Sequence, residues 1–430
     1  MAFHAENSRR SFRLFSKIQK YDWGNRNQQA FIPKLLGMPI HPGTPYAELW
    51  VGAHPKAPST IVPHGKRGIK LPNAMTLDQF IQQDPERILG IEAAHKYGQL
   101  PFLFKLLSIG DVLSIQAHPN KEQAQKLHDE DPRFYPDSNH KPEMAVCLDD
   151  FRALVGFMPF TGILTILDQY PEILDLLEEE AYEGIVECDR VINEGEERDS
   201  VQEESALRHL IEHLCSKALD DSFVLARATG TLQLRLESES LTRKLTEKEQ
   251  LFLYLKMRYS GEDIGLFLLF LMNYIELDSG EAISIPPGTL HAYLHGNIVE
   301  CMASSDNVVR AGFTQKHRDV ATLVQILDCK MQEPMVYRGL PSASQIEYPK
   351  FCDDFQLTQI NILPGQTWHL QNPGKAHLIY FVKGTAEVEY QLDSNTIKED
   401  YQKSHCIFVP AGLRKLSIAA SEKVLMFHAR

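Results

Sequence analysis

Proline is distributed very unevenly along this chain, and that distribution most constrains the fold. Of 24 prolines in 430 residues, only Pro171 lies between Pro159 and Pro286. A proline inside a helix removes a hydrogen bond and clashes with the preceding turn. The proline-poor stretch also repeats apolar residues at intervals of three and four, as in LRHLIEHLCSKAL, which is typical of amphipathic helices. We therefore expect a helical insertion domain at 156–279.

The parts on either side of this insertion read as β structure. They contain short β-rich runs separated by proline and glycine, such as EAISIPPGTLHAYL and HLIYFVKGTAEVEYQL. Many short strands with such turns are typical of jelly rolls and barrels. We expect a mainly β fold, with one discontinuous β-domain at 1–155 and 280–330 and a second at 331–430. Lys383 and Gly384 stand between two alternating runs and predict a hairpin turn.

A short internal similarity links the two β regions. ISIPPGTLHAY in the first resembles CIFVPAGLRKL in the second, since both read as a strand, a P-x-G turn and another strand. His291 of the first copy corresponds to Lys415 of the second. If the two segments are copies of one unit, the second has lost a potential metal ligand, so we expect the C-terminal domain to hold no metal.

Charge and cysteine content limit the classes of function. The formal net charge is -13 at pH 7, whereas nucleic-acid binding depends on a large basic footprint, so we expect no nucleic-acid partner. The longest apolar run, 265–272, is too short to cross a bilayer and predicts a buried helix. Seven widely spaced cysteines without a C-x-x-C pair argue against a disulfide framework. Because the N-terminus also lacks a secretory pattern, we expect a cytoplasmic protein that makes no membrane contact.

Two segments of the first β region carry side chains suited to metal binding. In SIQAHP, period-two alternation directs Ser114, Gln116 and His118 to one face of a strand. In NHKPEMAV, Glu143 enters an apolar run, where a buried carboxylate needs a cation or strong hydrogen bonds. Taken singly, the first segment also fits a solvated strand face, and the second fits a salt bridge to Lys141.

A third segment, PPGTLHAYLHG, follows the helical insertion. His291, Tyr293 and His295 alternate onto one strand face there, which suits either a metal pocket or a polar surface. Together the three segments offer two imidazoles, a carboxylate and an amide oxygen. This set of nitrogen and oxygen ligands suits zinc, with manganese, iron, cobalt or nickel also compatible.

The next stretch, 299–319, concentrates charged and polar side chains in a loop. They are Glu300, Asp306, Asn307, Arg310 and Lys316. Arg310 is available for bidentate hydrogen bonds to a phosphate or a carboxylate. The alternative is a surface ion pair with Asp306 or Glu300.

The chain resembles the type I mannose-6-phosphate isomerases, which are zinc enzymes of the cupin class. The resemblance is carried by YDWGN (21–25), AELWVGAHPKAPS (47–59), LPFLFKLLSIGDVLSIQAHPNK (100–121), NHKPEMAV (139–146) and PPGTLHAYLHGNIVECMASSDNVVRAGFT (286–314). It implies cupin jelly-roll barrels and the interconversion of mannose 6-phosphate and fructose 6-phosphate through an enediol or enediolate. Within the matching motifs, Ala311 stands where glycine is common and Gln315 where proline is common.

The resemblance also implies roles for individual residues. It assigns one zinc ion per chain to Gln116, His118, Glu143 and His291. It makes Arg310 an essential residue, which we expect to grip the substrate phosphate with Lys141 and Ser114.

The identity of the catalytic base stays open between several groups. The candidates are Glu300, Lys316, Lys141, Asp306, His295 and a metal-bound water. Trp23, Glu48, Tyr293 and Asp306 are expected to line the substrate pocket of a monomer that binds a hexose 6-phosphate.

Two other functions remain compatible with the motifs. A non-catalytic sugar- or metal-binding cupin would keep the barrel and the metal without needing Arg310. A metal-dependent oxygenase would present two histidines and one carboxylate around iron, for which Gln116 as a fourth ligand fits less well.

Overall fold

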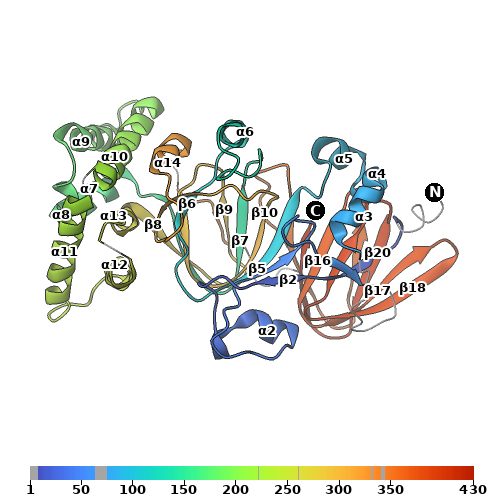
Figure 1. The fold of residues 1–430 in the computed structure, drawn as a ribbon. Coiled ribbons are helices and arrows are strands. Elements are labelled where there is room, and N and C mark those ends of the chain that lie inside the picture. The colour runs from blue at the N-terminus through green and yellow to red at the C-terminus, as the bar shows by residue number, and fades with distance from the viewer. Residues whose placement is uncertain (1–7, 63–74, 221, 260, 331–332, 340–343) are drawn as a thin grey trace.

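The computed structural model describes residues 8–62, 75–220, 222–259, 261–330, 333–339 and 344–430. The first residues of the segment in which we expect no secretory signal therefore lie outside the described residues. Within the described ranges, the strands form three antiparallel sheets, and a helical insertion lies at the end of the molecule opposite the C-terminal strands (Figure 1). The expected combination of β structure with a helical insertion is confirmed. No described helix is both long enough and apolar enough to cross a membrane.

The helical insertion follows the proline-poor stretch. Its helices are α7 (Phe160–Gln169), α8 (Pro171–Leu174), α9 (Glu179–Glu194), α10 (Ser200–Asp220), α11 (Ser222–Glu239), α12 (Glu247–Arg258) and α13 (Gly265–Leu271). A capping box between Thr246 and Glu249 begins α12, and Gly195 in the left-handed region ends α9. Every residue of α13 is buried, as the sequence predicted for this apolar run.

The main sheet carries the segments that point to chemistry. Along its path the strands are β12 (Val336–Tyr337), β9 (Ala282–Ile285), β7 (Glu143–Phe157), β10 (His291–Ala303), β5 (Phe102–Ile109), β3 (Glu48–Val51) and β2 (Lys17–Gln19). Three more strands join it from the side, namely β6 (Ile115–Ala117), β8 (Met272–Leu277) and β11 (Val309–Gly312). Strands from both sides of the insertion thus meet in one sheet, because β10 pairs with β7, β5 and β6.

A second sheet joins the N-terminal end of the chain to its C-terminal end. Its order is β13 (Gln345–Glu347), β14 (Leu357–Ile362), β21 (Val424–Ala429), β16 (His377–Lys383), β19 (Cys406–Val409), β1 (Phe12–Phe15) and β4 (Thr60–Val62). The third sheet contains β15 (Thr367–Gln371), β20 (Lys415–Ala420), β17 (Thr385–Leu392) and β18 (Asn395–Gln402). Strand pairing therefore crosses the boundaries expected from the sequence, with β1 and β4 beside C-terminal strands and β12 in the main sheet.

The hairpin predicted at Lys383 and Gly384 is wrong. The flanking strands β16 and β17 belong to different sheets and do not pair with each other. Gly384 has φ of 87° and turns the chain from one sheet to the next. A glycine turn between two alternating runs has the same local pattern whether the strands pair or cross between sheets.

Shorter helices occupy the connections. They are η1 (Asn27–Gln29), α2 (Phe31–Leu36), α3 (Leu77–Gln83), α4 (Pro85–Leu89), α5 (Ile91–Tyr97), α6 (Lys121–Glu130) and α14 (Val320–Ile326). Helices α3 to α5 lie close to the C-terminal strands, and α6 and α14 lie above the main sheet in the view of Figure 1.

Candidate active site

A buried cluster of metal-binding side chains lies where β6, β7 and β10 meet. His118, Glu143 and His291 are 1%, 2% and 1% exposed, and each offers a ligand atom within 4.8 Å of the others. His118 Nε2 is 3.3 Å from Glu143 Oε1, and His291 Nε2 is 3.5 Å from Glu143 Oε2. The three segments selected from the sequence therefore converge on one point.

Backbone carbonyls fix the tautomer of both histidines. His118 Nδ1 donates to the carbonyl of Asn307 at 2.8 Å, and His291 Nδ1 donates to that of Thr289 at 2.9 Å. Each imidazole therefore directs an Nε2 lone pair toward Glu143, and His118 Nε2 has no hydrogen-bond partner within the described residues. Burial, with the nearby Lys141 charge, lowers the pKa of His118 to about 4 and keeps the ring neutral. Buried imidazole lone pairs that face a buried carboxylate favour a bound cation.

Gln116 lies beside this cluster, as the alternation in SIQAHP predicted. Its register partners are His291 on β10 and Arg310 on β11. Its side-chain amide is 3.4 Å from His291 Nε2, and its oxygen accepts a hydrogen bond from Ser114 Oγ at 3.1 Å. The oxygen and nitrogen of an amide are assigned from the hydrogen-bond network. Exchanging them directs the oxygen toward His291, and the amide N–H then donates to Ser114 Oγ.

A cavity of about 450 Å³ opens above the cluster. Apart from His295, the residues expected to bind substrate or to catalyse line it, namely Trp23, Glu48, Ser114, Lys141, Tyr293, Glu300, Asp306, Arg310 and Lys316. Lys141 Nζ lies 3.3 Å from Glu143 Oε1, so the salt bridge considered from the sequence is present at the edge of the cluster. Burial lowers the pKa of Arg310 and of Lys316, since both face a partly closed cavity.

Known proteins resemble this chain over nearly its whole length. Residues 11–160 match the family model described as phosphomannose isomerase type I, catalytic domain. Mannose-6-phosphate isomerase from Schizosaccharomyces pombe is 37% identical over 97% of this chain and 99% of its own, and mannose-6-phosphate isomerase 2 from Arabidopsis thaliana is 34% identical over 97% and 92%. The chain belongs to the type I phosphomannose isomerase family.

Solved structures of the family share the fold. A variant of phosphomannose isomerase from Salmonella typhimurium superposes with a TM-score of 0.78 at 27% identity, covering 97% of this chain and 98% of the other. A mannose 6-phosphate isomerase whose structure was solved with zinc and yttrium has a TM-score of 0.76 at 27% identity, with the same coverage. Because the superpositions cover 97% of this chain, they include the helical insertion as well as the sheets.

Sequence reasoning missed Lys105, which lies in the floor of this phosphomannose isomerase cavity. Its Nζ is 3.1 Å from Glu300 Oε2 and 3.7 Å from Glu48 Oε2, and all three side chains are buried. Burial would lower the pKa of Lys105, but Glu48 and Glu300 raise it above the ordinary lysine value. Burial also raises the pKa of Glu300, although Lys105 opposes the shift. A lone lysine in FLFKLLSI, where all eight residues are buried, was the available signal.

The structure removes His295 from the candidate bases. The register of β10 against β7 shifts between Tyr293 and His295, so the strict alternation assumed for this face is broken. Tyr293 stays inside, with its hydroxyl 3.4 Å from Glu143 Oε2. The His295 side chain is 52% exposed and lies 3.9 Å from Asp150, outside the cavity.

The loop that precedes Arg310 is hydrogen-bonded to the loop that leads into β7, the strand that begins at Glu143. Asp306 N donates to Asp137 Oδ2 at 2.8 Å, and Asn307 Nδ2 donates to the carbonyl of Asn139 at 3.0 Å. The carboxylate of Asp306 lies 2.7 Å from Lys56 Nζ at the rim of the cavity. Because the Asn307 carbonyl also orients His118, the two loops and this candidate ligand share one hydrogen-bond network.

Proposed function

We propose that this chain catalyses the reversible isomerisation of mannose 6-phosphate and fructose 6-phosphate with one zinc ion. The observation that carries the proposal is a buried His–Glu–His cluster at the base of a cavity rimmed by cationic side chains. The family relationship supports the same reaction. The residues that would hold the zinc are Gln116, His118, Glu143 and His291.

The chemistry of the donor set supports a zinc ion. Two neutral imidazoles with unprotonated Nε2 atoms, one carboxylate and one amide oxygen suit zinc by ligand type. When bound, the ion supplies electrophilic stabilisation of negative charge on the sugar oxygens. The orphaned Nε2 of His118 supports the fit, because a buried nitrogen lone pair without a partner is unfavourable.

The cationic rim suits the phosphate of the substrate. We assign this grip to Arg310 and Lys316, with Ser114 as a further hydrogen-bond donor. Arginine forms paired, charge-assisted hydrogen bonds with phosphate oxygens. Holding the phosphate aligns the reacting carbons, which lowers the entropic part of the barrier. The expected contribution of Lys141 to this grip is less favoured, because its ammonium lies beside Glu143 at the cluster.

We assign the proton transfer to Glu300. After the ring opens, a base removes the proton from C2 and returns it to C1, while the hydroxyl proton moves from O2 to O1. Glu300 is 3% exposed, and burial raises its pKa, which makes its carboxylate a stronger base than an exposed glutamate. Lys141 is placed to exchange protons with the sugar oxygens. Lys316 is exposed at the rim, where its ammonium lies 5.7 Å from the centre of the Tyr21 ring.

The same proposal includes the finer architecture. We propose a cupin-type catalytic barrel from 1–155 and 280–330, the helical insertion at 156–279 and a C-terminal cupin-like β-domain at 331–430 without metal ligands. The exposed position of Lys415 supports the last point. We further propose that the protein is a monomer and that it is cytoplasmic. Seven unpaired cysteines support the cytoplasmic location.

A coupled assay with mannose 6-phosphate tests the function directly. Fructose 6-phosphate formation is measured with the protein as purified, after chelation and dialysis, and after zinc is returned. We expect turnover that disappears on chelation and returns with zinc, at the same rate with and without oxygen.

Two results would refute the proposal. Sugar phosphate binding without turnover at full zinc occupancy would indicate a binding protein. Consumption of oxygen with loss of activity under anaerobic conditions would indicate an oxygenase.

A further inference from the structure

Among the described residues, the helical insertion approaches the active-site cavity through a short segment made of 258–259 and 261–265. Arg258 and Tyr259 line the cavity together with Phe313 and Lys316. Arg258 also forms an ion pair with Asp111, which lines the same cavity. The insertion therefore forms part of the cavity wall.

Within this segment, Asp263 contacts the strand end that follows Arg310. Asp263 is 2% exposed, and its Oδ2 accepts a hydrogen bond from the backbone N–H of Phe313 at 2.9 Å. Its Oδ1 accepts from the backbone N–H of Gly265, also at 2.9 Å, and Arg318 Nη1 lies 3.8 Å from Oδ2. One buried carboxylate thus joins the insertion to the polypeptide between Arg310 and Lys316.

The backbone at this junction is tightly constrained. A Cβ atom on Gly312 would collide with Asp263 Oδ1 and would lie 2.7 Å from Gly265 Cα, so only glycine allows the two segments to approach. The next residue, Phe313, has φ of 56°, a left-handed conformation that is unfavourable for a bulky side chain. Such a conformation persists only where its surroundings determine it, here the Asp263 hydrogen bond and the Tyr259 ring, whose centroid lies 5.9 Å from that of Phe313.

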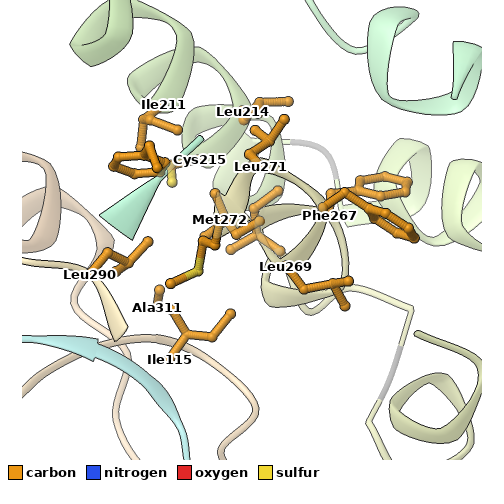
Figure 2. Packing of buried hydrophobic residues seen from close by; sticks show 14 of the residues in the cluster. Ile115, Ile211, Leu214, Cys215, Phe267, Leu269, Leu271, Met272, Leu290 and Ala311 are labelled. Carbon is orange, nitrogen blue, oxygen red and sulfur yellow. The ribbon is translucent and has the colours of Figure 1, made fainter. Parts of the chain in front are cut away.

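Apolar packing supports the same strand from behind. Figure 2 shows Ile115 and Ala311 beside Leu290 and Met272, with residues of α10 and α13 in the same cluster. Ile115 lies on β6 and Ala311 on β11, and alternation directs their neighbours Gln116 and Arg310 to the opposite face, toward the cavity. The insertion therefore supports the back of the two strands whose front faces carry the candidate ligand and arginine.

We propose that Asp263 is a positioning residue, through which the helical insertion sets the backbone of 312–316 and aims Arg310 and Lys316 at the substrate phosphate. This inference rests on the proposed function, because it assigns the phosphate grip to those two cations. It gives the insertion a defined task in substrate binding.

The test compares Asp263→Ala and Asp263→Asn with a control in the same insertion. Losing a hydrogen bond to a charged group weakens binding by roughly tenfold to a hundredfold, so we expect KM for mannose 6-phosphate to rise by about that factor in Asp263→Ala. The asparagine variant keeps one acceptor oxygen and should show a smaller rise. Zinc content should stay at one per chain, and hydrogen exchange should accelerate at the amides of 313–316.

Glu172→Gln is the matched control. Glu172 is 7% exposed and accepts two hydrogen bonds from Arg235, each of 2.8 Å, within the insertion and away from the 312–316 segment. This variant should lower thermal stability while leaving KM and the exchange of 313–316 unchanged. It therefore separates general loosening of the insertion from loss of the Asp263 contact.

Three outcomes would overturn the inference. Unchanged KM in Asp263→Ala with an active wild type would show that the contact does not position the phosphate grip. An equal rise of KM in Glu172→Gln would reduce Asp263 to a stabilising residue. If Asp263→Ala does not fold, a wild-type KM in Asp263→Asn together with wild-type exchange at 313–316 would also refute it. Absence of turnover in the wild type would instead refute the proposed function, and the exchange measurement would still report whether Asp263 holds the segment.

Discussion

Replacing Lys105 by methionine tests the electrostatics of the cavity floor. Methionine is one atom shorter than lysine, keeps most of the apolar side chain and removes the charge. Glu48 and Glu300, which are 7% and 3% exposed, then face each other without the cation that lies 3.7 Å and 3.1 Å from them. Because a carboxylate in such a site cannot keep its charge unpaired, we expect one additional carboxyl group to take up a proton when the variant folds.

The free-energy cost of that protonation sets the expected loss of folding stability in Lys105→Met. Keeping a glutamic acid neutral at pH 7, roughly 2.7 units above its ordinary pKa, costs about 3.7 kcal/mol at about 1.36 kcal/mol per unit. At pH 5.5 the same cost is about 1.6 kcal/mol. A carboxyl group whose pKa is raised by folding destabilises the folded state above its unfolded pKa, and the loss grows until pH passes the folded pKa. The destabilisation of Lys105→Met should therefore more than double between pH 5.5 and pH 7.

Denaturant unfolding of the zinc-saturated protein at both pH values measures this difference. Lys96→Met is the matched control, since Lys96 forms an exposed ion pair with Asp353 of the kind that contributes at most about 1 kcal/mol. Adding Glu300→Gln to Lys105→Met should restore part of the lost stability, because the amide needs no counter-charge. A loss below about 1 kcal/mol that does not change with pH would refute the assignment of a charged Lys105 between two carboxylates.

The remaining predictions concern the cluster and its surroundings. Arg310→Ala should lower kcat/KM for mannose 6-phosphate by at least about a hundredfold while zinc content, measured by atomic absorption, stays at one per chain; unchanged kinetics would remove this arginine from the reaction. His291→Ala and Glu143→Ala should each lose zinc on dialysis and unfold at a lower temperature, and a fully loaded variant would exclude that residue as a ligand. Lys415→Ala should leave zinc content unchanged, since a decrease would indicate a second site in the C-terminal sheets. His295→Ala should leave kcat unchanged because its side chain lies outside the cavity.

Much of the candidate site could be predicted from short-range patterns. The alternation in SIQAHP predicted which face of β6 carries Gln116, and the buried position of Glu143 followed from the apolar residues around it. Lys105 could have been found by the same reasoning, because a lone charge within a buried strand needs a partner. What the pattern could not supply was that partner, since Glu300 lies on a strand from the far side of the helical insertion.

Local patterns failed where the strand departed from regular geometry. His295 keeps its alternation with His291 in the sequence, yet a register shift after Tyr293 turns it to solvent. Bulges depend on the strands that pair alongside, so a single strand's sequence carries little sign of them. The hairpin prediction at Gly384 was wrong for a related reason. The conformation of this glycine permits both a hairpin and a crossing between sheets.

The amino-acid sequence by itself determined the helical middle of the chain, the β character of its flanks and the chemistry of the ligand set. Those features depend on side-chain type and on periods of two or 3.6 residues, which neighbouring positions specify. Only the tertiary structure decided that β1 pairs with β19, that Lys105 faces two carboxylates, and that Asp263 of the insertion holds the backbone beside Arg310. Such contacts join residues far apart along the chain, and their energies depend on which surfaces exclude water together, a property of the folded whole.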